Sequence, residues 1–163
     1  MGDYRKYLEP DYGEVAPEVE IMTPQCMDMN NTKAWRVKSN YESVSAMTLA
    51  YQKCNCYEEI MKIQTSDIKI QAAKEKINVR VYMPEKAEKC PVMIFYHGGA
   101  FSMNSIDVYE YVCRYMAWYG DMVVVSPDYH LAPEYKFPKG LNEAYDTLSL
   151  IHISEPTRLR CIS

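Results

Sequence analysis

The sequence predicts an α/β fold in which an antiparallel entry hairpin is followed by parallel strands that a crossover helix joins. Residues 68–72 and 77–83 alternate apolar and polar side chains, as strands with one buried face do. Residues 92–96 and 122–125 are continuously apolar, which is typical of strands buried on both faces. The order of these patterns therefore indicates a mixed sheet with helices packed on it.

The segments between the strands have signals of their own. Residues 74–76 (Lys-Glu-Lys) predict the hairpin turn. Apolar residues at helical spacing predict a helix over 108–119, with Ser105 or Asp107 as its N-cap and Gly120 as its stop. A strand, a helix and a strand in this order form a right-handed parallel crossover.

Residues 1–62 are expected to form an N-terminal arm and a cap-like helix. The first 40 residues are polar and proline-containing, so we expect an arm with one short helix there. From Asn40 the apolar residues recur at steps of three and four, namely Val44, Met47, Tyr51, Cys54, Tyr57 and Met61. This face predicts packing against the core, and the alternative is that it lines a substrate entrance. A further helix is expected to begin at Gly140.

Composition limits the classes of function. The chain has 163 residues, a net charge of -4 and no run of basic residues, which argues against nucleic-acid and anionic-membrane partners. Its first residues lack an apolar stretch, so we expect no signal peptide, no membrane span and a cytoplasmic protein. The six cysteines are scattered, and the spacing of Cys54 and Cys56 is too short for the usual zinc motif. We expect reduced thiols, no metal and no cofactor.

A glycine pair follows the first continuously apolar run, within residues 97–101 (His-Gly-Gly-Ala-Phe). Ligands of open α/β sheets bind beyond the carboxyl ends of the strands. Adjacent N–H groups in such a turn can both point at one oxyanion, as acyl transfer requires. A glycine turn can also cradle phosphate or simply reverse the chain.

Residues 126–134 (Ser-Pro-Asp-Tyr-His-Leu-Ala-Pro-Glu) follow the second apolar run. Together the two motifs resemble the hormone-sensitive-lipase-like branch of the α/β-hydrolase fold, over residues 68–147. The resemblance implies a partial α/β-hydrolase core at 63–147 and a carboxylesterase that works through a serine acyl-enzyme on small-molecule esters. It implies that the N–H groups of Gly98 and Gly99 form the oxyanion hole. The alternative is a non-catalytic small-molecule binding protein on the same fold.

The remaining residues of the two motifs have supporting roles by this resemblance. His97 and Ala100 are expected to support the glycine loop, and Asp128, His130 and Glu134 to brace the loop after the fourth strand. Two positions depart from the family's usual pattern: Ala100 stands where a third glycine is common, and His130 where arginine is usual. Neither histidine is expected to be the catalytic base, because the triad of this fold runs in the order Ser, Asp or Glu, His.

The sequence contains no Gly-x-Ser-x-Gly motif, so the nucleophile and the triad are absent from it. We expect an N-terminal part of a hydrolase, truncated before the nucleophile strand and inactive by itself. Residues 148–163 resemble the translation of a sequencing-library adapter, and we expect them to be non-native. Without a fifth strand, residues 92–96 would form an open apolar edge, which predicts an insoluble or chaperone-bound chain.

Overall fold

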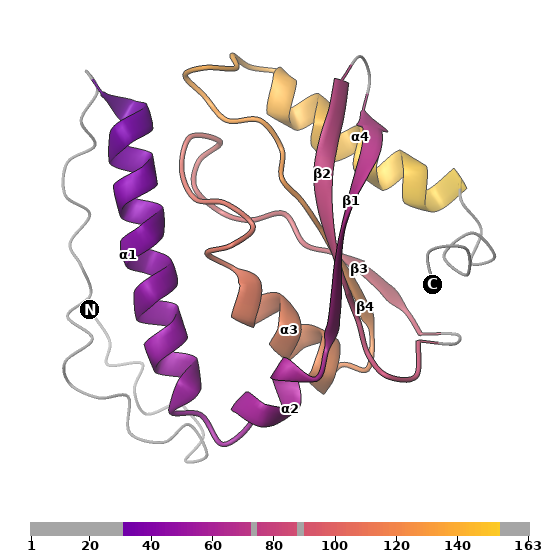
Figure 1. Ribbon diagram of the computed structural model, residues 1–163. Coiled ribbons are helices and arrows are strands. Elements are labelled where there is room, and N and C mark those ends of the chain that lie inside the picture. The colour runs from indigo at the N-terminus through magenta and orange to yellow at the C-terminus, as the bar shows by residue number, and fades with distance from the viewer. Residues whose placement is uncertain (1–30, 73–74, 88–89, 154–163) are drawn as a thin grey trace, which may run out of the picture.

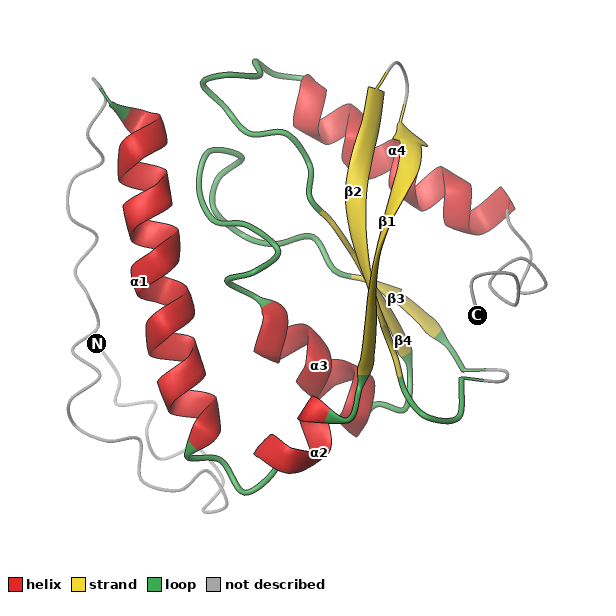
Figure 2. Cartoon of the chain, in the orientation of Figure 1, coloured by secondary structure: helices red, strands yellow, loops and turns green. Residues whose placement is uncertain are grey.

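The computed structural model describes residues 31–72, 75–87 and 90–153 (Figure 1). One sheet of four strands carries helices on both faces (Figure 2), which confirms the predicted α/β class. In chain order the elements are α1 (Thr32–Gln52), α2 (Tyr57–Met61), β1 (Gln64–Ala72), β2 (Glu75–Met83), β3 (Val92–Ile94), α3 (Glu110–Tyr119), β4 (Val123–Pro127) and α4 (Lys139–Ile153).

The entry hairpin is antiparallel, as predicted, but its turn is tighter. Ala72 pairs with Glu75, so only residues 73–74, which lie outside the described residues, connect β1 to β2. The predicted turn at 74–76 is therefore wrong at Glu75 and Lys76, which begin β2. Full pairing along both strands outweighs the turn preference of these charged residues, because each additional pair satisfies backbone groups.

The sheet has the order β1-β2-β4-β3. β4 pairs antiparallel with β2 and parallel with β3, and α3 makes the crossover between the two parallel strands, as predicted. All five residues of β4 are buried. β3 has one strand neighbour among the described residues, so the predicted open edge is confirmed. The predicted burial of β3 on both faces is wrong, because Val92 is 39% exposed at this edge.

The two faces of the sheet hold separate apolar clusters. Val124 packs with Cys113 and Ala117 of α3 on one face. Its neighbours Val123 and Val125 point to the other face, where they meet side chains of the β1–β2 hairpin. This alternation follows from the two-residue period of a strand. In Figure 1, α2 and α3 lie beside the first face, and α4 crosses behind the hairpin on the other.

The boundaries of α3 differ from the prediction only at its start. The helix begins at Glu110 and its N-cap is Tyr109, with no side-chain cap bond, so neither Ser105 nor Asp107 caps it. Residues 106–109 form turns instead, since Tyr109 and Glu110 donate backbone hydrogen bonds three residues back. Gly120 is confirmed as the stop, and its N–H donates to the Met116 carbonyl at 3.0 Å.

The N-terminal helix begins earlier than predicted, at Thr32, and a break after Gln52 separates it from α2. Tyr51 stacks on Tyr111 of α3 with 5.1 Å between ring centroids. Part of the predicted apolar face therefore packs on the core, while Tyr41 on the same helix is 75% exposed. Among the described helices, none is long and apolar enough to span a membrane.

The last helix, α4, extends through Ile153 and so enters the segment 148–163 that we expect to be non-native. Residues 151–153 continue the helix. The domain boundaries at 62 and 147 stay predictions.

Candidate active site

The glycine loop leaves β3 at the carboxyl end of the parallel strands, where the sequence placed it. Its carbonyls are used internally: Ser102 and Met103 both donate backbone N–H bonds to the Gly99 carbonyl, at 3.0 and 2.9 Å. The N–H groups of Gly98, Gly99 and Ala100, in contrast, donate to no group of the described residues. Unpaired backbone donors are rare in folded chains unless solvent or a ligand meets them. The loop therefore offers three adjacent donors.

Glycine is required at the second position of the pair. Gly99 has a φ of +132°, and a Cβ there would lie 2.2 Å from the Met103 carbonyl oxygen. A Cβ at Gly98 would meet the Tyr109 hydroxyl at 3.0 Å, which is a movable side-chain atom. Ala100 and Phe101 follow with φ values of 52° and 56°, so two successive non-glycine residues adopt the left-handed conformation. Backbone strain of this kind is found at functional sites, where surrounding structure enforces it.

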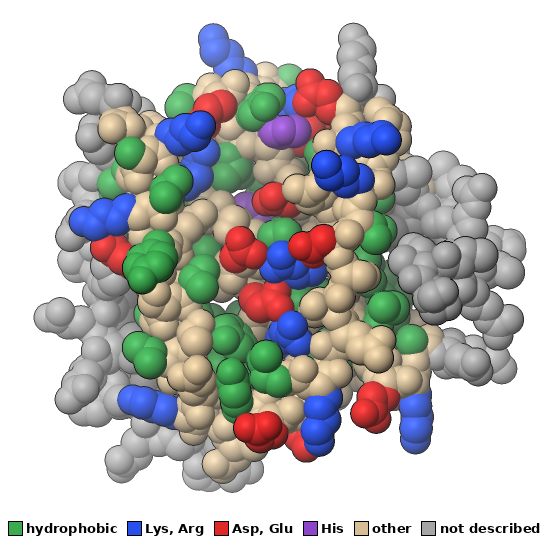
Figure 3. Space-filling model, in the orientation of Figure 1, with side chains coloured by type: hydrophobic (Ala, Val, Ile, Leu, Met, Phe, Trp, Pro, Cys, Tyr) green, Lys and Arg blue, Asp and Glu red, His purple; other side chains and the backbone are tan. Residues whose placement is uncertain are grey.

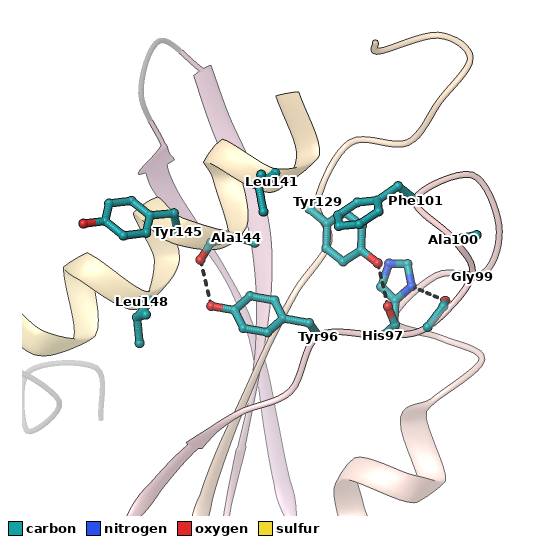
Figure 4. A pocket seen from close by; sticks show the side chains of 11 residues that line it. Tyr96, His97, Gly99, Ala100, Phe101, Tyr129, Leu141, Ala144, Tyr145 and Leu148 are labelled. Atoms are coloured by element: carbon teal, nitrogen blue, oxygen red, sulfur yellow. Dashed lines mark hydrogen bonds between the residues drawn. The ribbon is translucent and has the colours of Figure 1, made fainter. Parts of the chain in front are cut away.

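His97 is buried beneath the loop and is 2% exposed. Its ring stacks on Tyr129 at 4.4 Å, and its Nδ1–H donates to the Gly98 carbonyl at 3.0 Å, since a carbonyl can only accept. The Tyr129 hydroxyl donates to the His97 carbonyl at 2.5 Å (Figure 4). Burial lowers the pKa of the imidazole, so the neutral ring is favoured. His97 thus braces the loop from below.

A pocket of about 440 Å³ opens beside these donors. Its lining is mainly apolar and aromatic and comes from three segments: Tyr96 to Phe101 of the glycine loop, Tyr129, and Leu141, Ala144, Tyr145 and Leu148 of α4. Figure 4 shows Tyr96 reaching toward α4, where its hydroxyl donates to the Ala144 carbonyl at 2.7 Å. Polar donors at one end of an apolar cavity suit a ligand with an apolar body and a polar reacting group.

The second motif lies beside the glycine loop. The Ala132 N–H donates to the Phe101 carbonyl at 2.7 Å, which joins the two loops directly. Asp128 donates its backbone N–H to the Asn78 carbonyl, and burial raises the pKa of its carboxyl. These contacts tie the loop after β4 to both the glycine loop and β2.

His130 bonds to a residue that the sequence did not single out. Glu143 of α4 accepts from the His130 backbone N–H at 2.8 Å and lies 2.7 Å from its Nδ1. Glu143 is 2% exposed, so this pair is an internal contact between the loop and α4. A glutamate in the first turns of a helix carries no distinctive sequence signal, because such residues are common on solvated faces.

The same corner holds the one set of described residues with metal-ligating geometry. Glu75, His130 and Glu143 each offer one ligand atom, and these atoms lie within 4.8 Å of one another. The Lys139 ammonium already lies between the carboxylates, 2.7 Å from Glu75 and 3.4 Å from Glu143. The positive charge that this group of acids requires is therefore supplied by the protein itself.

Glu134 also has a partner that sequence reasoning missed, Arg36 of α1. The guanidinium contacts both carboxylate oxygens, at 3.2 and 3.0 Å, and lowers the pKa of this carboxyl. The two residues are far apart in the sequence, so no local pattern could have paired them.

Acidic and basic side chains are interleaved over the face of the molecule in Figure 3, without a large area of one sign.

Comparison with known proteins agrees with this geometry. Residues 93–159 match the family described as alpha/beta hydrolase fold. The chain is 35% identical over 88 residues to esterase LipI of Mycobacterium tuberculosis, and this match covers 52% of this chain and 27% of LipI. It is 40% identical over 73 residues to carboxylesterase NlhH of the same species, covering 44% and 23%. The chain thus spans about a quarter of the length of these curated relatives.

Solved structures show the same likeness over more of the chain. EstE1, a thermophilic carboxylesterase cloned from a metagenomic library, is 33% identical with a TM-score of 0.61, over 72% of this chain and 37% of EstE1. The Pyrobaculum calidifontis esterase is 32% identical with a TM-score of 0.61, over 73% of this chain and 36% of that one.

The sheet order, the glycine loop at the end of β3 and these likenesses define a hydrolase-type α/β protein. Residues 93–159 match the α/β-hydrolase fold family, and the relatives and solved structures named above are carboxylesterases and esterases.

Proposed function

We propose that the whole protein to which this chain belongs hydrolyses carboxylic esters of small molecules through a serine acyl-enzyme. The observation that carries the proposal is the set of unpaired N–H groups at Gly98 and Gly99, on a loop that lines an apolar pocket. Such donors stabilise the negative oxygen of a tetrahedral intermediate more strongly than the neutral carbonyl of the ester, and that difference lowers the barrier. The relatives named above are esterases.

The other motif residues are assigned supporting roles within this proposal. His97 and Ala100 maintain the shape of the glycine loop, while Asp128, His130 and Glu134 brace the neighbouring loop. The nucleophilic serine, the acid and the base come from residues outside this chain. We place the whole protein in the cytoplasm, on the sequence evidence given above.

The test is an assay of the complete reading frame with 4-nitrophenyl acetate. Gly99→Ala should lower kcat by roughly 100-fold, the size of effect seen when one oxyanion donor is lost. Lys38→Ala is the control, since its side chain is 65% exposed on α1, and it should keep the activity. A complete protein with no ester hydrolysis would contradict the proposal.

The 163-residue chain should show no turnover of the same ester, because it has the oxyanion donors but no nucleophile. Activity of this chain that Gly99→Ala abolishes would overturn that expectation. The alternative of a non-catalytic binding protein predicts a complete reading frame in which the serine or the histidine of the triad is replaced.

A further inference from the structure

Arg36 of α1 contacts the glycine loop. Its Nε–H donates to the Ser102 carbonyl at 2.8 Å, and its Nη2–H donates to the Ala132 carbonyl at 2.5 Å. The same guanidinium pairs with both oxygens of Glu134. The Arg36 side chain is only 15% exposed, so one cation from α1 connects the glycine loop with the loop after β4.

These contacts fall on the strained part of the glycine loop. The Phe101 carbonyl accepts from the Ala132 N–H at 2.7 Å, and the next carbonyl, that of Ser102, accepts from Arg36. Two successive carbonyls, those of the left-handed residue Phe101 and of Ser102, are therefore fixed from outside. A strained backbone persists only where its surroundings determine it. The contacts from Ala132 and Arg36 enforce the strained conformation at the end of the loop, and those of His97 enforce it at the start.

The arrangement depends on the shape of arginine as well as on its charge. A guanidinium presents several N–H donors in a fixed plane, so it can serve two carbonyls and a carboxylate at once. An ammonium is a single point from which donors radiate, and it cannot reach all three acceptors in these directions. Lysine at this position would keep the charge near Glu134 and lose at least one carbonyl contact.

We propose that Arg36 is a positioning residue that keeps the glycine loop, residues 98–102, in the conformation in which the Gly98, Gly99 and Ala100 amides are free to act as donors. This inference rests on the proposed esterase function and adds to it a role for α1 in transition-state stabilisation. Arg36 touches no reacting atom. Its loss should misplace the oxyanion donors while leaving the apolar pocket that binds the substrate, so the effect should fall on kcat rather than on KM.

The experiment compares Arg36→Ala, Arg36→Lys and the control Lys38→Ala in the complete protein. Lys38 lies on the same helix, and its side chain is 65% exposed. With 4-nitrophenyl acetate and active sites counted by organophosphate titration, Arg36→Ala should lower kcat per active site by roughly 100-fold, with KM within about twofold. Arg36→Lys should fall between Arg36→Ala and the wild type, and Lys38→Ala should match the wild type.

Amide hydrogen exchange gives a second readout that does not need activity. The amides of Ser102 and Met103, which bond to the Gly99 carbonyl, should exchange faster in Arg36→Ala and not in Lys38→Ala. If the Arg36→Ala protein fails to fold, Arg36→Lys provides the same comparison. Unchanged kcat per active site in an active protein, or a loss explained entirely by fewer titrated sites, would overturn the inference. An inactive wild type would instead refute the proposed function, and the exchange rates would still test the role of Arg36.

Discussion

β3 and β4 have the same kind of sequence and opposite surroundings. Both are short, continuously apolar runs, and both are followed by a loop that carries a motif. β4 pairs on both sides and is buried along its whole length, whereas β3, within the described part of the chain, pairs on one side and Val92 is 39% exposed. A continuously apolar run thus indicates that a strand is suited to burial on both faces, but it does not indicate whether the adjacent strands of the sheet are present.

The loops after the two strands differ in a related way. The loop after β4 uses its polar groups internally: Asp128 bonds to β2, His130 to Glu143, and Glu134 to Arg36. The loop after β3 contains left-handed residues and leaves three N–H groups without described partners. Local rules of structure are satisfied in the supporting loop and broken in the candidate active site, as expected where function competes with stability.

The largest expected effect contrasts the two strands directly. Val124→Asp places a charge at a fully buried position and should cost more than about 3 kcal/mol, because the side chain lies in an apolar cluster with Cys113 and Ala117. Val92→Asp at the open edge should cost less than about 1 kcal/mol. Urea unfolding of the 163-residue chain, refolded from the insoluble fraction, measures the difference. Equal losses would show that β3 is covered in solution.

The second contrast lies within the glycine loop. Gly99→Ala should lower stability by about 2 kcal/mol, because a Cβ at φ +132° clashes with the Met103 carbonyl. Gly98→Ala should cost less than about 1 kcal/mol, since only the Tyr109 hydroxyl must move. Thermal unfolding of the two variants checks the order, and a more stable Gly99→Ala protein would show that the loop has another conformation.

The third prediction concerns the pH dependence of stability. The pKa of His97 lies below its usual value of 6.5 because the ring is buried, so the folded state binds protons less readily than the unfolded state. Its contribution to stability is therefore complete above about pH 6.5 and is lost as the pH falls. His97→Gln should flatten the decline in melting temperature between about pH 7 and pH 5. An unchanged decline in melting temperature would show that a group other than His97 causes it.

The smallest expected effect is a gain. Ala100→Gly should stabilise the protein by about 0.5 kcal/mol, because glycine relieves a left-handed conformation at φ 52° and loses part of that gain to unfolded-state entropy. Ala46→Gly, the same change at an exposed position of α1, should instead cost about 1 kcal/mol. Calorimetry of both variants tests whether the two stability changes have opposite signs. A loss of stability in both variants would show that Ala100 is not strained.

Local patterns in the sequence determined the order of strands and helices, the crossover, the stop at Gly120 and the placement of both motifs at one end of the sheet. These features follow from period, apolar runs and glycine, which act over a few residues. Only the tertiary structure decided that β3 is an edge, that Glu143 bonds to His130, and that Arg36 of α1 reaches Ser102. Such contacts join residues far apart in the chain, and their energy depends on distances that no local pattern encodes.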